Sequence, residues 1–319
     1  MRAVWLREFG GPGVLGVEET PDPVPAPGQV LVKVEYANIT WIETMFRASG
    51  FGSFPRPPMI PGNGVGGVIV AAGSAAEERL VGTRVVTGTG GSGGYAELVA
   101  VDAGSVIEVP AGVPADEAVA LLADGRTALM IIDAAGIEPG DRVLVEAAAG
   151  GVGSLLVQLA VAAGATVVAV AGGPRKVALA RELGASAAID YRQPGWAEAA
   201  GRVDVVLDGV GGEIAETAFG LLDRGGRMIS FGFSSGAGWP DVSDDVAAER
   251  GIRVQRGVFG DPAEQTRRSA EALALAAAGR LRPVIGQRFR LEEASEAHRA
   301  MESRAVIGKT LLTVLTGAV

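Results

Sequence analysis

A short glycine-rich segment is the part of the sequence whose residue types and spacing point most directly to chemistry. It reads AAGGVG from Ala148 to Gly153, follows the apolar residues 143–145 and precedes an apolar stretch that begins at Ser154. A glycine turn between a strand and a helix brings backbone N–H groups close to a pyrophosphate, and the helix N-terminus favours the negative charge. The context predicts a dinucleotide site, although Ala148 replaces the first glycine of the usual pattern and a turn that binds nothing is the minor alternative.

The end of the next expected strand indicates which dinucleotide is favoured. Residues 169–173 read AVAGG and lack the carboxylate that binds the adenosine ribose in NAD sites. Arg175 and Lys176 follow at the start of a predicted helix, where cations are mildly unfavourable with the helix dipole but suit a 2′-phosphate. The pattern favours NADPH over NADH; the alternative is that the two cations form a solvated helix end.

Residues 41–59 hold a large share of the aromatic side chains in a chain with 9 Phe and 4 Trp. Glycines and prolines make part of this segment a loop, where exposed aromatic side chains often meet ligands. These aromatic side chains could line a pocket for a flat, apolar substrate or pack in the core, and the sequence favours neither hypothesis over the other. The predicted pocket residues are Trp41, Met45, Phe46 and Phe51, together with Trp239 from a later glycine-rich stretch.

Composition excludes several other kinds of chemistry. The chain has no cysteine and a single histidine, His298, so thiol catalysis is excluded and a zinc site is not expected. A formal charge of −9 disfavours nucleic acid as a partner. The first residues lack the apolar region of a signal peptide, and no apolar run of ~18 residues occurs, which predicts a cytoplasmic protein without a membrane partner.

The surrounding elements form two different patterns. Residues 1–122 contain short β segments between Gly and Pro, expected at 3–6, 30–36, 66–71, 84–87 and 95–101. From about residue 116, Ala- and Leu-rich stretches alternate with Val-rich runs, which is typical of a parallel sheet covered by helices. Strands are expected at 142–146, 166–170, 187–189, 203–207, 227–231 and 252–258, with helices at 153–163 and 174–183 between the first three. The C-terminal part predicts a helix at 262–278, a strand at 286–289, a polar helix at 291–302 and a last strand at 308–314.

Several motifs taken together resemble the zinc-independent medium-chain dehydrogenases/reductases of the quinone oxidoreductase (zeta-crystallin-like) group. The matching segments are residues 8–12, 61–68, 94–97, 127–128, 147–153, 190–192 and 307–309, with Lys176. The resemblance implies an α/β fold with a GroES-like β-rich catalytic domain at 1–122, completed by 262–319, and a Rossmann NADPH-binding domain with a doubly wound parallel sheet at 123–261. It also implies a metal-free site, because Asn63 stands where zinc-dependent relatives have a histidine ligand.

The resemblance and the glycine pattern together predict the cofactor contacts. These residues are Ala149, Gly150, Gly151, Val152, Gly153, Gly172, Arg175, Lys176, Tyr191, Gly209, Phe231, Gly232, Phe259 and Lys309. The chain departs from the family where Gly172 and Gly173 replace the usual serines. Thr40 and Met45 likewise stand where asparagine and tyrosine are common.

The implied reaction is hydride transfer from NADPH to a quinone or to the activated C=C bond of an enone or enoyl substrate. Such a reaction builds negative charge on the substrate oxygen, and hydrogen-bond donors must stabilise that charge when no metal does. The candidates are Asn38, Thr40 and Thr127, although Asn38 and Thr40 are equally suited to satisfying turn backbone. A structural charge is the favoured role for Glu43, and His298 is expected to be exposed on a polar helix without a catalytic role.

The sequence is also compatible with two other functions, and it predicts an oligomeric state. The same chemistry suits a tailoring enoyl or ketone reductase of polyketide-type biosynthesis, and a non-catalytic NADPH-binding protein would share the fold. The segment 252–259 is expected to be an outer strand that pairs with a second copy, which predicts a homodimer.

Overall fold

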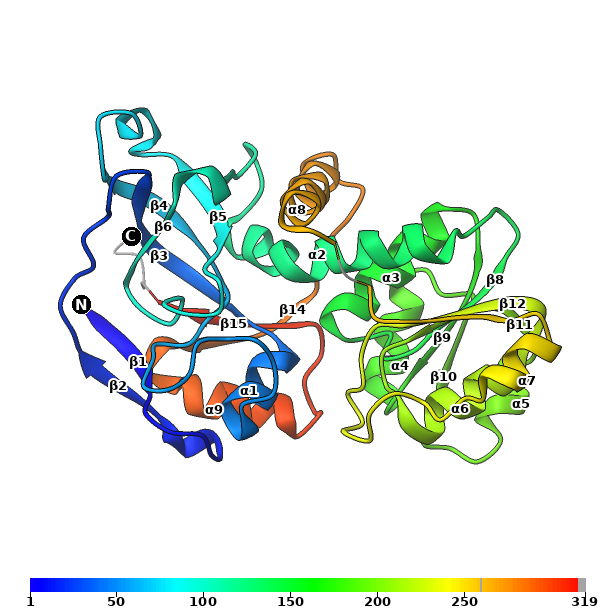
Figure 1. Ribbon diagram of the computed structural model, residues 1–319. Helices are drawn as coiled ribbons and strands as arrows, with labels where there is room; N and C mark the ends of the chain where they lie inside the picture. Colours follow the sequence, from blue (N-terminus) through cyan, green and yellow to red (C-terminus); the bar gives the residue numbers. More distant parts are fainter. Residues whose placement is uncertain (259, 315–319) are drawn as a thin grey trace. The chain divides into compact units, whose positions relative to one another are not determined.

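The chain forms two compact units in the computed structural model, which describes residues 1–258 and 260–314 (Figure 1). Unit 1 comprises residues 1–123 and the C-terminal segment that starts at Ser269, and unit 2 comprises Asp124–Arg268. The two divisions fall within helices α2 (Ala115–Ala135) and α8 (Pro262–Ala277). The predicted α/β fold class, a β-rich domain with a doubly wound domain, is confirmed.

Unit 1 is built on a sheet of seven strands in the order β14-β15-β3-β4-β5-β7, with β6 paired to β3. All these pairs are antiparallel except β14 with β15. A separate hairpin joins β1 and β2. The strands are β1 (Arg2–Leu6), β2 (Leu15–Glu19), β3 (Gln29–Ile39), β4 (Gly64–Ala72), β5 (Arg84–Gly88), β6 (Leu98–Asp102), β7 (Ile107–Glu108), β14 (Ile285–Arg290) and β15 (Lys309–Thr313), with helices α1 (Trp41–Ser49) and α9 (Ala294–Glu302) and 3-10 turns η1 (Pro12–Val14), η2 (Glu78–Leu80), η3 (Ala103–Ser105) and η4 (Leu291–Glu293).

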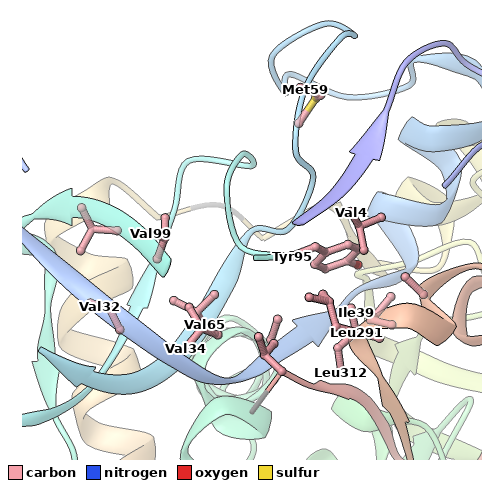
Figure 2. Close-up of a cluster of buried hydrophobic side chains, with 14 of the residues drawn as sticks. Val4, Val32, Val34, Ile39, Met59, Val65, Tyr95, Val99, Leu291 and Leu312 are labelled. Carbon is pink, nitrogen blue, oxygen red and sulfur yellow. The ribbon is translucent and has the colours of Figure 1, made fainter. Parts of the chain in front are cut away.

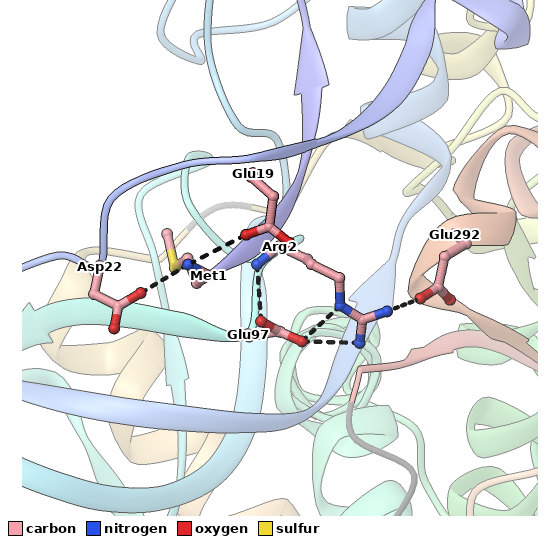
Figure 3. A network of polar contacts seen from close by, with 6 residues as sticks. All are labelled: Met1, Arg2, Glu19, Asp22, Glu97 and Glu292. Atoms are coloured by element: carbon pink, nitrogen blue, oxygen red, sulfur yellow. Dashed lines mark hydrogen bonds and ion pairs between the residues drawn. The ribbon is translucent and has the colours of Figure 1, made fainter.

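The C-terminal segment completes the sheet of unit 1. Strand β15 pairs with β3 and places Leu312 opposite Ala37. Arg2 adds a polar connection, because its guanidinium binds Glu97 at 2.8 Å and also contacts Glu292 (Figure 3). Segments from the beginning, middle and end of the sequence therefore stabilise one another.

Alternating apolar residues of β3 build the core of unit 1. Val30, Val32 and Val34 are fully buried, and Figure 2 shows several of their neighbours, contributed by segments far apart in the sequence (Figure 2). Burying a Val or Leu side chain contributes about 1.5–3 kcal/mol. This core holds the end of β3 and the start of α1 in place, where the candidate catalytic residues Asn38 and Thr40 lie.

Unit 2 contains a parallel sheet of six strands in the order β10-β9-β8-β11-β12-β13. The chain builds outward from β8 to β10 and then returns to place β11 on the other side of β8, so the topological switch point lies between β8 and β11. Its strands are β8 (Arg142–Val145), β9 (Thr166–Ala171), β10 (Ala187–Asp190), β11 (Val203–Asp208), β12 (Leu222–Ser230) and β13 (Arg253–Arg256), and its helices are α3 (Gly151–Ala162), α4 (Pro174–Glu182), α5 (Trp196–Ala200), α6 (Gly212–Leu221) and α7 (Asp244–Glu249).

Helix α1 was not among the predicted elements. The glycines and prolines of residues 41–59 predict a loop for part of this segment. Residues 41–49 instead form a helix, which is capped by Gly50 in the left-handed conformation. None of the helices in the described part of the chain is long and apolar enough to cross a membrane.

Candidate functional site

The glycine turn follows β8 and leads directly into α3. Gly150 precedes this 12-residue helix, and its N–H donates to the Ala147 carbonyl at 2.8 Å. Gly153 packs so closely on the turn that a Cβ at its position would lie 2.2 Å from the Ala147 oxygen. Three of the five residues from Ala149 to Gly153 are glycines at the N-terminus of a helix, which is the arrangement that accepts a phosphate group.

The end of β9 brings together most of the residues predicted to recognise the adenosine phosphate. Gly172 lies beside Tyr191, whose hydroxyl oxygen would be 3.1 Å from a Cβ at that position. Gly173 has a φ of 105° and connects to α4, where Arg175 is exposed and Lys176 is half-buried. No carboxylate occurs in β9 itself, although the Asp190 carboxylate at the end of β10 accepts a hydrogen bond from the Gly173 backbone.

Arg192 adds a cation that the predicted contacts did not include. Its Nη2 would be 2.7 Å from a Cβ at Gly173, and it binds Asp190 through bonds of 3.0 and 2.9 Å. The hydrogen bond from Arg192 lowers the pKa of Asp190. The signal was present in the sequence, because Asp190, Tyr191 and Arg192 are adjacent and form one of the matching motifs.

The loops after β11 and β12 also lie side by side in unit 2. The ring of Phe231 would be 2.6 Å from a Cβ at Gly209, and Gly232 lies next to the Gly209 carbonyl. Trp239 packs edge-on against Phe233 with ring centroids 4.9 Å apart and is 37% exposed. Phe259, another predicted cofactor contact, lies outside the described residues.

Unit 1 places Asn38 and Thr40 at the end of β3. Asn38 is buried, and its Oδ1 accepts no hydrogen bond from the described residues. Thr40 precedes α1 and donates to Glu43 Oε2 through both its N–H, at 2.7 Å, and its hydroxyl, at 2.6 Å. The Asn63 N–H donates to the other oxygen of Glu43 at 2.9 Å. Glu43 therefore fixes the start of α1 and the segment at Asn63, as expected for a structural charge.

Charge and burial act in opposite directions on Glu43. Burial raises the pKa of its carboxyl group, while hydrogen bonds from Thr40 and the positive charge of Lys309 act to lower it. Lys309 is itself buried, at the start of β15. The structure thus places Lys309 in unit 1 beside Glu43, and Thr127 half-buried in the part of α2 that belongs to unit 2.

Comparisons with known proteins agree with this arrangement. A model described as "Alcohol dehydrogenase GroES-like domain" matches residues 26–111, and one described as "Zinc-binding dehydrogenase" matches residues 183–312. The quinone oxidoreductase of Pseudomonas aeruginosa is 31% identical over 325 residues, which cover 98% of this chain and 99% of that protein. The human quinone oxidoreductase is 31% identical over 322 residues, covering 98% of this chain and 97% of that protein.

The chain belongs to the quinone oxidoreductase family of medium-chain dehydrogenases/reductases.

Solved structures support the family assignment. The Escherichia coli quinone oxidoreductase complexed with NADPH has a TM-score of 0.88 at 29% identity, covering 98% of this chain and 100% of that chain. The Thermus thermophilus quinone oxidoreductase, also solved as a complex with NADPH, has a TM-score of 0.82 at 33% identity over 98% of this chain and 100% of that chain. The resemblance predicted from the sequence motifs is therefore confirmed.

The predicted substrate wall of this family member is corrected in one place. Trp41 and Met45 are half-buried and lie four residues apart on α1, and Phe51 is 47% exposed. Phe46, by contrast, is 2% exposed and packs edge-on against Phe9 and Phe54. Phe46 is therefore a core residue, because its position on α1 faces the apolar interior.

The predicted exposure of His298 is wrong. It is 1% exposed, and its Nε2 lies 3.1 Å from the Tyr95 hydroxyl. Burial lowers the pKa of His298 to about 3, with a further contribution from the positive charge of Arg47. Helix α9 presents Ala294, Ala297 and His298 to the core at helical spacing, so the histidine occupies an apolar face although its neighbours in sequence are charged.

The predicted role of Thr40 as a donor to substrate also requires correction. A threonine hydroxyl has one proton to donate, and that of Thr40 goes to Glu43. The hydroxyl therefore supports the start of α1 and has no proton left for a substrate oxygen.

Proposed function

We propose that this member of the family is an NADPH-dependent oxidoreductase that reduces a quinone, or the activated C=C bond of an enone or enoyl substrate, without a metal ion. The observation that carries the proposal is the convergence of two features in unit 2. The glycine turn before α3 suits the pyrophosphate, and β9 ends without an acid of its own and is followed by Arg175 and Lys176, while the neighbouring Asp190 is paired with Arg192.

The residues present fit the dinucleotide. The close approach of Gly153 to Ala147 leaves a turn in which an added Cβ would clash, as a tightly packed phosphate-binding turn requires. Arg175 and Lys176 supply positive charge for the 2′-phosphate that distinguishes NADPH from NADH. When bound, the cofactor supplies the hydride; the chain binds it, orients it and excludes water.

The negative charge that develops on the substrate oxygen needs hydrogen-bonding groups. We assign this role to Asn38 of unit 1 and, as a separate candidate, to Thr127 of unit 2. Asn38 is the buried polar residue at the end of β3, and its Nδ2 is the donor that the assignment requires. Its Oδ1, which accepts no hydrogen bond from the described residues, can only accept one from a ligand. The apolar side chains that we propose for contact with a flat substrate are Trp41, Met45 and Phe51 in unit 1 and, separately, Trp239 in unit 2.

The hypothesis of a metal-free site rests on which side chains could serve as metal ligands. The chain lacks cysteine, Asn63 occupies the position of the histidine ligand, and the described residues contain no group of three or more His, Asp or Glu side chains that could hold an ion. The residues present therefore do not suit a zinc ion.

Cofactor choice is tested with the double variant Arg175→Ala, Lys176→Ala. Each charge-assisted hydrogen bond contributes ~1.5–3 kcal/mol, so the Kd for NADPH should rise by about two to four orders of magnitude while the Kd for NADH stays unchanged. An unaltered NADPH/NADH preference would contradict the assignment.

Turnover is tested by following NADPH absorbance with quinones, alkyl enones and enoyl thioesters. Consumption of NADPH with a quinone or a small enone supports the proposal, whereas activity confined to thioesters favours a biosynthetic tailoring enzyme. Tight NADPH binding without turnover on any compound would show a non-catalytic binding protein.

We also propose a homodimer. Strand β13 is the edge of the parallel sheet, so its outer N–H and C=O groups are available to a second copy. Light scattering at micromolar concentration should give the mass of two chains, and a monomer would refute the proposal.

A further inference from the structure

Two buried acids meet at the switch point of the parallel sheet in unit 2. Glu146 follows the last residue of β8, and Asp208 is the last residue of β11, the neighbouring strand. Both side chains are fully buried. The Glu146 N–H donates to the Leu207 carbonyl at 3.0 Å, which fixes the two residues side by side.

One oxygen of each carboxyl group accepts hydrogen bonds from backbone N–H groups. Asp208 Oδ1 accepts from the N–H groups of Val210 and Gly211 at 3.0 and 2.8 Å. Glu146 Oε2 accepts from the same Val210 N–H at 3.2 Å. Both acids therefore hold the loop between β11 and α6, which contains the predicted cofactor contact Gly209.

The other two oxygens lack a group that would stabilise a second negative charge. Glu146 Oε1 and Asp208 Oδ2 are buried, and neither has a hydrogen-bond partner in the described part of the chain. Glu146 Oε2 and Asp208 Oδ1 accept from the same Val210 N–H, so the two buried carboxyl groups lie side by side, and a proton on one of them removes the repulsion between two carboxylates. Burial, followed by the negative charge of Asp208, raises the pKa of Glu146 well above its ordinary value.

We infer that Glu146 is a positioning residue of the dinucleotide site and acts as a neutral acid, donating one shared proton to Asp208 so that Asp208 holds the loop at residues 209–211. The inference rests on the proposed binding of NADPH to unit 2. When the proton leaves to solvent, two buried carboxylates repel each other, and they add negative charge at the switch point where a pyrophosphate is expected to bind. Binding of NADPH is therefore linked to retention of this proton.

The surroundings contain few groups that could produce the same effect. Helix α3 and strand β9 contain no charged residue, and β12 presents the buried Ser230 hydroxyl opposite Asp208. On α6, Glu213 and Glu216 are exposed. Arg227, three residues before Ser230 on β12, binds the carbonyls of Ala135 and Gly136 and the carboxylate of Asp141. Among the described residues, Asp208 is thus the charged neighbour that acts on Glu146.

The test compares the full-length wild-type protein with Glu146→Gln, whose amide donates to Asp208 without a titratable proton. The Kd for NADPH is measured by fluorescence between about pH 6.5 and about pH 9.5. We expect the wild-type Kd to rise about tenfold or more towards alkaline pH, while the Kd of Glu146→Gln stays within about threefold of its neutral value. Repeating the titration with NADH removes the contribution of the 2′-phosphate.

Glu213→Gln is the matched control, because it removes the same charge from an exposed position at the start of α6. Its pH profile should follow that of the wild type. Asp208→Asn is the second variant: Glu146 stays titratable there but loses its negatively charged neighbour, so the rise in the Kd should begin at a lower pH than in the wild type. Infrared difference spectra of the wild type at neutral pH should show a protonated carboxyl band that Glu146→Gln lacks.

The possible results separate this inference from the proposed function. If NADPH binds but the wild type and Glu146→Gln share one pH profile, or if no protonated carboxyl band distinguishes them, the inference is wrong and the cofactor assignment stands. If the wild type binds NADPH at no pH, the proposed function fails and the inference fails with it.

Discussion

Tyr95 and His298 form a hydrogen bond of 3.1 Å inside unit 1, although 203 residues separate them in the sequence. The contact joins the segment before β6 to helix α9, so it links the N-terminal part of the unit to its C-terminal part. Both groups are buried, and burial raises the pKa of Tyr95 while it lowers that of His298. The pair is therefore neutral in the folded protein across the physiological range.

His298 should make the stability of the protein depend on pH under acidic conditions. Its pKa is about 3 when folded and 6.5 when exposed, so the unfolded chain binds a proton that the folded chain does not bind between these values. This residue's contribution is present above pH 6.5 and is lost, by about 1.4 kcal/mol per pH unit, as the pH falls towards about 3. Urea unfolding of the wild type and His298→Gln should show the shallower pH dependence in the variant, and parallel curves would contradict the assignment.

Phe46 and Met45 should respond differently to truncation, because one lies in the core and the other is half-buried. Phe46→Ala should lower the free energy of unfolding by about 3–5 kcal/mol. Met45→Ala should have a smaller effect on stability but raise the KM for an apolar substrate. Denaturant melts together with steady-state kinetics check both; equal losses of stability would remove Met45 from the proposed pocket.

Gly153 should not tolerate a side chain, because a Cβ there would lie 2.2 Å from the Ala147 oxygen. Gly153→Ala should displace α3 from the turn, lower stability by about 1–3 kcal/mol and raise the Kd for NADPH about tenfold or more. Gly220→Ala, near the end of α6, is the control, since an added Cβ meets nothing within 4 Å. Calorimetry and cofactor titration that show both variants to be alike would count against the close packing of this turn.

Asn38 and Thr40 should be separable by their effects on turnover. Asn38→Ala should reduce kcat by about two to three orders of magnitude if its amide stabilises the developing charge. Thr40→Val should reduce kcat by less than about threefold and cost about 1 kcal/mol of stability, because its hydroxyl serves Glu43. A large fall in kcat for Thr40→Val with unchanged stability would reverse the two roles.

The sequence by itself determined the features that depend on local pattern. Alternating Val residues in 30–36 predicted β3, and the Val-rich run 142–146 before AAGGVG predicted β8, the turn and α3. The sequence also showed that β9 carries no acid at its end, because this requires only that the strand and its position after the glycine turn are recognised. Family motifs then extended the prediction to both units.

Only the tertiary structure decided which distant polar groups meet. His298 stands among charged residues in the sequence, yet α9 packs that face against the core, where Tyr95 supplies a partner. Glu146 meets Asp208 because the chain returns to place β11 beside β8 after building β9 and β10 on the other side. Burial and hydrogen-bond partners of this kind depend on which strands become neighbours, and residue spacing does not encode that order.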